Sequence, residues 1–482
     1  MKRTEKIGAL CGLLAVCCAA AFAAAHTKQK QEDIRETGET ILEIDENTVT
    51  ALSWENEDGS LSFSQNDGVW TYDTDSNFPA DPEKLTGLLA AFHPLNASFI
   101  IENAEDTGQY GLDDPICTIR LTADGIDYEI LLGDYSAMDS KRYVSIGDGN
   151  VYLAAQDPYE SFDAGLADVI LNDELPAFET ARSVTFSGDQ DYSIAWKEES
   201  GSTFREDDHY FAQLTDGELP LDTGRVEDYL YEIKNLDLSD YVTYRATGED
   251  LASCGLDEPQ LTISIDYRAE NEEGEESEET FLLHVSRDPK EQEEAEKKEN
   301  SEKEQEEDAS SGQEDAEETV TAYARVGDSP ILYRISKSEY EALMAAGPND
   351  LRHREILPAS PESIDTIDIS LDGSRYTLTR EGSGDSLTWL YEEKELETED
   401  FQNALTALQA AQSASFDVQD SGGEEEIRLT LHLDLEGNPQ AEISFLRYDG
   451  DDCLAVLDGT PLCYVSRESV VRLIEAVHSF VL

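Results

Sequence analysis

Short runs of alternating hydrophobic and polar residues, followed by a helical stripe, begin the folded part of the chain. Residues 49–54 alternate, and Gly59 and Gly68 separate them from two further runs, as expected for strands joined by turns. A helix is predicted after Asp81, which can cap its free amides. Its apolar residues follow i, i+3, i+4, i+7 spacing and form one stripe: Leu85, Leu88, Leu89 and Phe92. We expect this stripe to cover the sheet formed by the neighbouring strands.

The same helical spacing occurs twice more along the chain. The second set is Val226, Tyr229, Leu230 and Ile233, and the third is Phe401, Ala404, Leu405 and Leu408. A strand is predicted after each helix, near Phe99, Tyr241 and Phe416. Recurrence at this scale indicates one structural unit repeated in tandem.

Shared residues around these elements define a repeat signature. A Gly-Leu-Asp-x-Pro motif appears twice, and its glycine permits positive φ while its proline keeps the preceding residue out of a helix. The third copy lacks the motif and has diverged. We interpret the signature residues as turns, caps and core aromatics: Trp70, Asp81, Gly111, Asp113, Pro115, Asp222, Gly255, Asp257, Pro259 and Trp389.

The predicted fold class is α+β, with three tandem repeats after an N-terminal membrane helix. Each repeat is expected to be an antiparallel sheet with one or two covering helices. A recurring linker, 172–176 and 354–358, sets the boundaries near 178 and 360. The predicted parts are therefore an anchor or signal peptide (1–30), a tether (31–44), repeat 1 (45–178), repeat 2 (179–360) and a diverged repeat 3 (361–482).

Acidic residues dominate the composition. The 107 Asp and Glu against 34 Lys and Arg give a formal charge of −73, which repels phosphate backbones and excludes nucleic-acid binding. Residues 288–318 hold 15 acids and 4 lysines, with no aromatic or β-branched residue. Such a segment buries too little apolar surface to offset its ordering entropy, so it is predicted to be a disordered insertion in repeat 2.

An apolar run from Ile7 to Ala25 follows Lys2, Arg3 and Lys6. At ~1.5 Å per residue a helix of this length just crosses a hydrocarbon core of ~30 Å, which favours an uncleaved anchor with the remaining chain outside the cytoplasm. The small residues of AFAAAH leave a cleaved signal peptide as the alternative. A lipoprotein at Cys17 is a further, weaker alternative, because Val16 replaces the small residue that such a site requires.

Two cysteines near the end of the chain form a candidate disulfide. Cys453 and Cys463 flank a predicted hairpin turn, at places that tyrosine pairs occupy in the earlier copies. Two side chains facing each other across a hairpin would permit a crosslink in an oxidising compartment, with free thiols as the equal alternative. Cys117 and Cys254 are interpreted as isolated core residues.

Catalytic and metal motifs are not found in the sequence. The segment from Asp73 to Asn77 begins like a calcium loop, but Phe78 and Lys84 stand where glycine and glutamate are required. The seven histidines are scattered without ligand spacing, so no metal, cofactor or catalytic residue is assigned. The four tryptophans could line a sugar-binding face, although Trp70 and Trp389 occupy matching positions beside a strand and are interpreted as core residues.

The signature resembles the bacterial domain of unknown function 4340 family over most of residues 45–360, and more weakly beyond. The resemblance implies one membrane span followed by repeated α+β units, and genes beside components of ABC transporters of gliding-motility or auxiliary export type. It supplies no catalytic residues. We therefore expect a non-enzymatic, extracytoplasmic accessory or scaffold protein, tethered in the cell membrane, with ABC-transporter subunits as partners. An envelope glycan-binding module or cell-wall enzyme is the alternative, and a surface spacer is a third.

Overall fold

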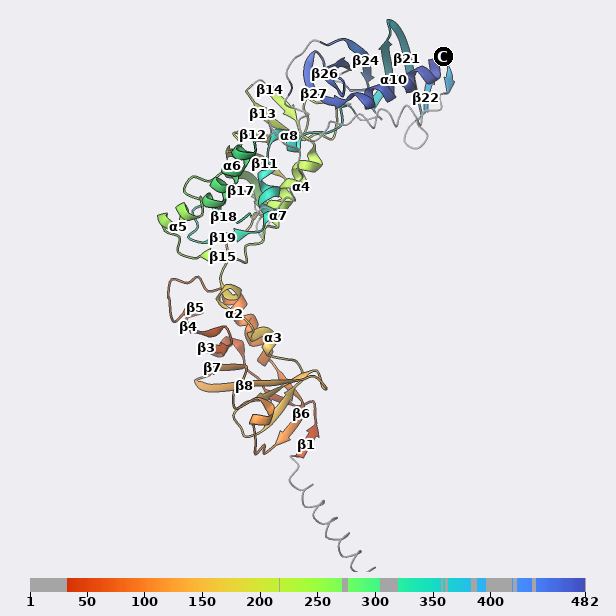
Figure 1. Cartoon of the computed structure of the whole chain (residues 1–482). Helices are drawn as coiled ribbons and strands as arrows, with labels where there is room; N and C mark the ends of the chain where they lie inside the picture. The colour runs from red at the N-terminus through yellow and green to blue at the C-terminus, as the bar shows by residue number, and fades with distance from the viewer. Residues whose placement is uncertain are drawn as a thin grey trace, which may run out of the picture. The chain divides into compact units, whose positions relative to one another are not determined.

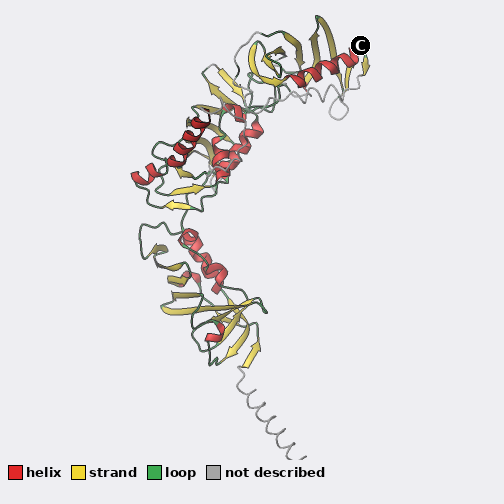
Figure 2. Cartoon of the chain, in the orientation of Figure 1, coloured by secondary structure: helices red, strands yellow, loops and turns green. Residues whose placement is uncertain are grey.

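The computed structural model describes residues 33–215, 217–270, 276–303, 320–356, 359, 363–382, 388–395, 418, 423–435 and 439–481. Strands form most of its regular structure and every strand pair is antiparallel, within three separate sheets (Figure 2). This arrangement of antiparallel sheets with a few helices is the predicted α+β class. Within the described ranges no helix combines the length and apolar character needed to cross a membrane. The predicted anchor at Ile7–Ala25 lies outside these ranges.

The first sheet has the strand order β1-β6-β10-β9-β8-β7-β3-β4-β5, and β2 pairs with β6 (Figure 1). Its strands are β1 Asp33–Glu36, β2 Thr40–Leu42, β3 Val49–Asn56, β4 Gly59–Asn66, β5 Val69–Tyr72, β6 Leu95–Glu102, β7 Cys117–Ala123, β8 Ile126–Ser136, β9 Lys141–Ser145 and β10 Val151–Ala154. Its helices are η1 Glu46–Thr48, α2 Pro82–Leu89, η2 Ala90–Phe92, η3 Gly108–Tyr110, α3 Tyr159–Phe162 and η4 Leu166–Val169.

The second sheet has the order β14-β13-β12-β11-β16-β17-β18-β19-β15. Its strands are β11 Ala181–Gly188, β12 Tyr192–Trp196, β13 Tyr210–Leu214, β14 Gly217–Pro220, β15 Tyr241–Thr243, β16 Leu261–Glu270, β17 Glu276–Arg287, β18 Ala322–Val326 and β19 Leu332–Ile335. Its helices are α4 Thr223–Lys234, α5 Gly248–Ser253, α6 Pro289–Lys303, α7 Lys337–Met344 and α8 Pro348–Leu351.

The third sheet has the order β23-β22-β21-β20-β24-β25-β26-β27. Its strands are β20 Ile364–Leu371, β21 Ser374–Glu381, β22 Thr388–Tyr391, β23 Lys394–Glu395, β24 Glu425–Leu433, β25 Gln440–Arg447, β26 Asp452–Leu457 and β27 Thr460–Ser466. The helix α10, Arg467–Val481, follows the last strand and contacts β26 and β27. The predicted third helical stripe and the strand near Phe416 lie outside the described residues.

The three sheets repeat one topology. Numbering the shared strands of a copy from one to eight gives the order 3-2-1-5-6-7-8-4 in the first two sheets, and the described part of the third gives 3-2-1-5-6-7-8. The first strand of each sheet is even interrupted at the same place, between Val49 and Ala51, between Ala181 and Ser183, and between Ile364 and Thr366. Tandem repetition of one fold explains both facts.

The first two helical stripes are buried as their spacing predicted, except that Leu88 is only half-buried. Helix α4 buries Val226, Tyr229, Leu230 and Ile233, and α2 buries Leu85 and Leu89. Asp81 caps α2 by accepting hydrogen bonds from the backbone amides of Glu83 at 2.8 Å and Lys84 at 3.2 Å. Asp222 caps α4 through the Arg225 amide at 3.3 Å. These carboxylates therefore satisfy amides that have no partner within the helix.

The glycine of the repeated motif ends a short helix in the left-handed region. Gly111 has φ of 72° after η3, and Gly255 has φ of 70° after α5. A Cβ on Gly111 would lie 2.6 Å from the carboxyl carbon of Asp134 and 2.7 Å from its backbone nitrogen in β8. Both conformation and space thus require glycine. Both motif aspartates are exposed, and Asp113 accepts a hydrogen bond from the Thr107 hydroxyl at 2.5 Å.

The prolines and tryptophans of the signature also have structural positions. Pro115 and Pro259 each stand two residues before a strand, β7 and β16. Trp70 and Trp389 occupy the same place on the third strand of their sheets and are 5% and 3% exposed. Core packing, as predicted, accounts for both tryptophans.

The prediction of disorder for residues 288–318 is wrong over the first half of that segment. Residues Pro289–Lys303 form helix α6, and the remainder of the predicted segment lies outside the described residues. Asp288 accepts hydrogen bonds from the amides of Lys290 and Glu291, and Lys297 pairs with Glu293 one turn away at 3.1 Å. Glu, Lys, Gln and Ala favour helix even where no apolar face is available to bury, which the compositional argument overlooked.

The candidate disulfide is absent from the structure. Cys453 and Cys463 are buried free thiols, and their partners across β26 and β27 are Val465 and Ala455, so they sit diagonally. The comparison with tyrosine pairs also fails. In the first copy, for example, Tyr143 faces Leu153 whereas Tyr152 faces Val144, which places the two tyrosines on opposite faces of the sheet.

The chain divides into two compact units, 1–172 and 173–482. The second and third sheets therefore share one unit, where the sequence predicted separate repeats on either side of residue 360. Their joint is apolar: Ile356 and Ala359 of the linker belong to the core of the third sheet, and Phe204 of the second repeat packs against that core. Shared hydrophobic burial at this joint explains why the two repeats are not separate units.

Candidate functional site

The repeats serve as internal references that separate fold-forming residues from residues specific to one copy. The backbone amide of Asp81 donates to the Val169 carbonyl at 2.9 Å, and that of Asp222 donates to the Leu351 carbonyl at 3.0 Å. This shared contact makes Leu171 the counterpart of His353, in agreement with the linker match in the sequence.

The loop between the second and third strands also differs between copies. In the first copy it is the two-residue turn 67–68, whereas in the second copy residues 197–209 join β12 to β13. The fold forms without this longer loop and without His353. Both features are therefore candidates for function, because loops on a rigid scaffold commonly carry it.

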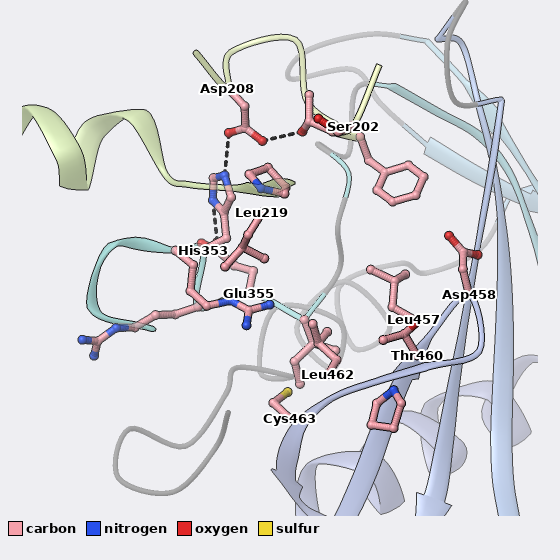
Figure 3. Close-up of a pocket in the computed structure, with 17 residues that line it drawn as sticks. Ser202, Asp208, Leu219, His353, Glu355, Leu457, Asp458, Thr460, Leu462 and Cys463 are labelled. Carbon is pink, nitrogen blue, oxygen red and sulfur yellow. Dashed lines mark hydrogen bonds and ion pairs between the residues drawn. The ribbon is translucent and has the colours of Figure 1, made fainter. Parts of the chain in front are cut away.

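A cavity of about 290 Å³ lies where these two features meet the third repeat. Figure 3 shows Leu219 and His353 on one side, with Leu457 and Thr460 of the β26–β27 hairpin opposite and Cys463 below. Its wall is largely apolar, with charged groups from the linker 352–356 at one end. This volume is near the lower end for ligand pockets, and fits one side chain or a group of similar size.

A buried hydrogen-bond network forms one wall of the cavity. His353 Nε2 lies 2.6 Å from Asp208 Oδ1, and the Thr203 hydroxyl donates to Asp208 Oδ2 at 2.5 Å (Figure 3). The side chain of Asp208 is only 2% exposed. A carboxylate accepts, so Nε2 carries the hydrogen, and the two bonds compensate for burial of the charge.

The other ring nitrogen of His353 faces two carboxylates without forming a hydrogen bond. Nδ1 lies 3.6 Å from Asp222 Oδ2 and 3.9 Å from Glu355 Oε2. Each of these acids already has an arginine within reach, Arg225 for Asp222 and Arg205 for Glu355, both at 3.5 Å. The arginines supply the positive charge at this end, and no metal-binding cluster of three or more His, Cys, Asp or Glu occurs among the residues described.

The arrangement suits binding better than covalent chemistry. The Asp208 carboxylate stands between the Thr203 hydroxyl and the His353 ring, so the imidazole is not placed to take the hydroxyl proton. Burial raises the pKa of the Cys463 thiol to about 12, against the opposing effect of Arg352. A nucleophile needs a neighbouring base or a lowered pKa. The pKa of Cys463 is raised, and the base beside Thr203 is a buried carboxylate that already accepts a second hydrogen bond from His353.

Few of the signature residues reach this site. Asp222 is brought to it, beside Nδ1 of His353, while Trp70, Gly111, Pro115 and the others hold the folds of their own copies. Sequence reasoning missed Thr203, Asp208 and His353. His353 and Asp208 are separated by 145 residues, and nothing in their local sequence marks the pairing. The available signal was the extra loop length of the second copy.

Trp54 is not available to bind a sugar, because its side chain is buried. That residue is 1% exposed, and its indole nitrogen donates to the Ala164 carbonyl at 2.8 Å. Trp196 is 38% exposed, at the end of β12. The two side chains therefore have different roles, with Trp54 in the core.

Comparison with protein families gives a match to the domain of unknown function DUF4340 in two overlapping segments, residues 70–259 and 213–429. Each segment begins on the third strand of one copy. The first ends at Pro259, two residues before the fifth strand of the next copy, and the second ends at Leu429, on the equivalent strand of the third copy, which agrees with tandem duplication. No curated protein and no solved structure matches the chain. The chain belongs to the DUF4340 family.

Proposed function

From this family membership and the geometry of the cavity, we propose a membrane-tethered accessory or scaffold protein that acts by binding and not by catalysis. The bulk of the chain lies outside the cytoplasm, held to the cell membrane by the N-terminal apolar run. Its partner is a subunit of an ABC-type transporter, as the gene context implied by the family resemblance suggests. The observation that carries the binding role is a cavity between the second and third repeats, lined by a loop and a histidine that the first copy lacks.

The site favours a protein partner that inserts one apolar side chain. Leu219 and Leu462 supply apolar wall, and the hydrogen bond between Asp208 and Nε2 of His353 fixes a polar wall. A pocket of this kind, at the joint of two repeats, is typical of an interface anchor site. The proposal therefore places the transporter contact at the cavity.

The experiment is copurification of the intact chain with transporter subunits in several mild detergents. Leu219→Trp fills the cavity, and Leu214→Trp is its matched control, because Leu214 lies on the neighbouring strand, is 40% exposed and does not line the cavity. Transporter subunits are expected with the unmodified chain and with L214W, and they are lost with L219W. Their absence from the unmodified chain in every detergent would refute the partner, and their retention by L219W would refute the contact site.

The alternative functions differ in their support. A cell-wall enzyme has no reacting pair in this cavity to rest on. A glycan-binding role is favoured by one specific observation, the exposed Trp196, which lies in a different groove of the second repeat.

A further inference from the structure

Trp196 is the one exposed tryptophan of the chain. Trp54, Trp70 and Trp389 are 1%, 5% and 3% exposed, whereas Trp196 is 38% exposed. Its ring lies 5.9 Å from the His209 ring, tilted by 32°. Trp196 is therefore the tryptophan whose ring can meet a ligand from solvent.

The other copies show that the fold does not need an aromatic residue here. Trp196 pairs with Tyr210, and the equivalent pairs are Gln65 with Trp70 and Arg380 with Trp389. The buried aromatic partner is thus present in all three copies, while its neighbour is polar in two of them. Trp196 is specific to the second copy, as are the features of the cavity above.

An open groove of about 800 Å³ surrounds Trp196 at this end of the second sheet. Its wall includes Phe178, Arg182 and Arg268, and four glutamates, Glu179, Glu198, Glu270 and Glu276. The arginines pair with carboxylates: Arg182 pairs with Glu278, and Arg268 lies 3.4 Å from both Glu276 and Glu278. The groove therefore presents hydrogen-bond donors and acceptors together with an aromatic ring.

We propose that this groove binds a neutral carbohydrate chain. The C–H face of a pyranose ring is apolar and packs on the indole, while ring hydroxyls both donate to carboxylates and accept from guanidinium groups. The four glutamates outnumber the three cations of the wall, Arg182, Lys197 and Arg268, and the chain as a whole carries a formal charge of −73, so a neutral ligand is favoured over a polyanion. The open form of the groove admits a chain instead of a single enclosed molecule. This site goes beyond the transporter contact and does not depend on it.

The test on the full chain uses the tetramer of β-1,4-linked N-acetylglucosamine as the neutral probe and acrylamide quenching as the readout. Since the other tryptophans are buried, quenching reports mainly on Trp196, and bound tetramer is expected to protect its fluorescence. Calorimetric titration then compares variants. Trp196→Gln, which carries the residue of the first copy, is expected to weaken binding by at least about tenfold, while Trp196→Phe keeps most of it.

Tyr231→Ala is the matched control, because Tyr231 is a 60% exposed aromatic of the same unit outside the groove. It is expected to bind the tetramer as the unmodified chain does. Unprotected fluorescence together with no binding heat at millimolar tetramer would overturn the proposal. Equal binding by W196Q and the unmodified chain would overturn it as well. The copurification result can stand or fall separately, since the groove shares no lining residue with the cavity.

Discussion

Replacing His353 with leucine tests the buried network at the candidate site. Leucine is the natural choice because the equivalent position of the first copy is Leu171. The change leaves the Asp208 carboxylate, 2% exposed, with the Thr203 hydroxyl as its one remaining partner in the network. An uncompensated buried charge is costly, so the substitution should destabilise the second unit although leucine suits an apolar wall.

The expected cost of His353→Leu is about 3 kcal/mol, the lower end for breaking a buried pair, because the ring is 18% exposed and water can enter the cavity. Adding Asp208→Asn removes the stranded charge and keeps an acceptor for Thr203. The double variant should therefore cost about 1–2 kcal/mol and be more stable than H353L alone. If Asp208→Asn restores part of the stability lost in H353L, the cause of that loss is the unpaired charge of Asp208.

Hydrogen exchange of native protein is the appropriate assay, because a chain of several repeats need not unfold in one step. Amides in β13 and α8 should lose protection in H353L and regain part of it in the double variant. His478→Leu is the control: its ring lies 3.6 Å from Asp372 and is 39% exposed, so about 0.5 kcal/mol or less is expected. Equal effects of H353L and H478L, or no rescue by D208N, would refute the reasoning.

Three further expectations follow from single positions. In Gly68→Ala the new Cβ meets no atom within 4 Å, so the variant should lose about 1 kcal/mol of stability for the φ of 84° alone. In Gly111→Ala the Cβ also lies 2.7 Å from the β8 backbone, so the loss should be about 1–3 kcal/mol greater. Equal unfolding midpoints of the two variants in urea would contradict this. Burial opposes ionisation of Asp368, but hydrogen bonds from three neighbouring side chains outweigh it and lower its pKa from 3.8 to about 2. The stability that Asp368 contributes is therefore complete above pH 3.8 and is lost as the pH falls towards 2. Asp368→Asn should remove that part of the pH dependence of the melting temperature, measured by circular dichroism. An unchanged pH dependence in the variant would contradict the prediction. Cys453 and Cys463, whose pKa values burial raises to about 12, should react with iodoacetamide only after unfolding, and failure of both to react after unfolding without reductant would indicate a crosslink.

Much of the fold could be predicted from the sequence, because each copy carries the same local signals for caps, turns and helices. Asp81 and Asp222 cap helices, Gly111 and Gly255 need positive φ, and the stripes of α2 and α4 match a helical period. These are short-range constraints, which a single sequence displays directly. Repetition strengthened each inference, since one pattern occurring in several places is hard to produce by accident.

The candidate site was not predictable by the same means. Asp208, His353 and Leu462 come together only through the joint between two repeats, and each is unremarkable in its own segment. The disulfide prediction failed for a related reason: spacing along a hairpin does not fix which residues of β26 and β27 are opposite, and the irregular register at Ala455 changes the pairing. Long-range placement needs coordinates, whereas caps and turns do not.

Comparison among copies gives a physical criterion for function where no relative of known activity is at hand. A residue that recurs in equivalent positions is explained by the fold, as the buried aromatic row of Trp70, Tyr210 and Trp389 is. The fold does not explain a residue that differs from its counterparts in the other copies, faces a cavity and is not needed for burial. His353 in place of Leu171 and Trp196 in place of Gln65 both meet that description, at two separate places of the second repeat. The duplication thus supplied a stable sheet whose core positions stay fixed, while its loops and strand ends were free to acquire binding groups at little cost in stability.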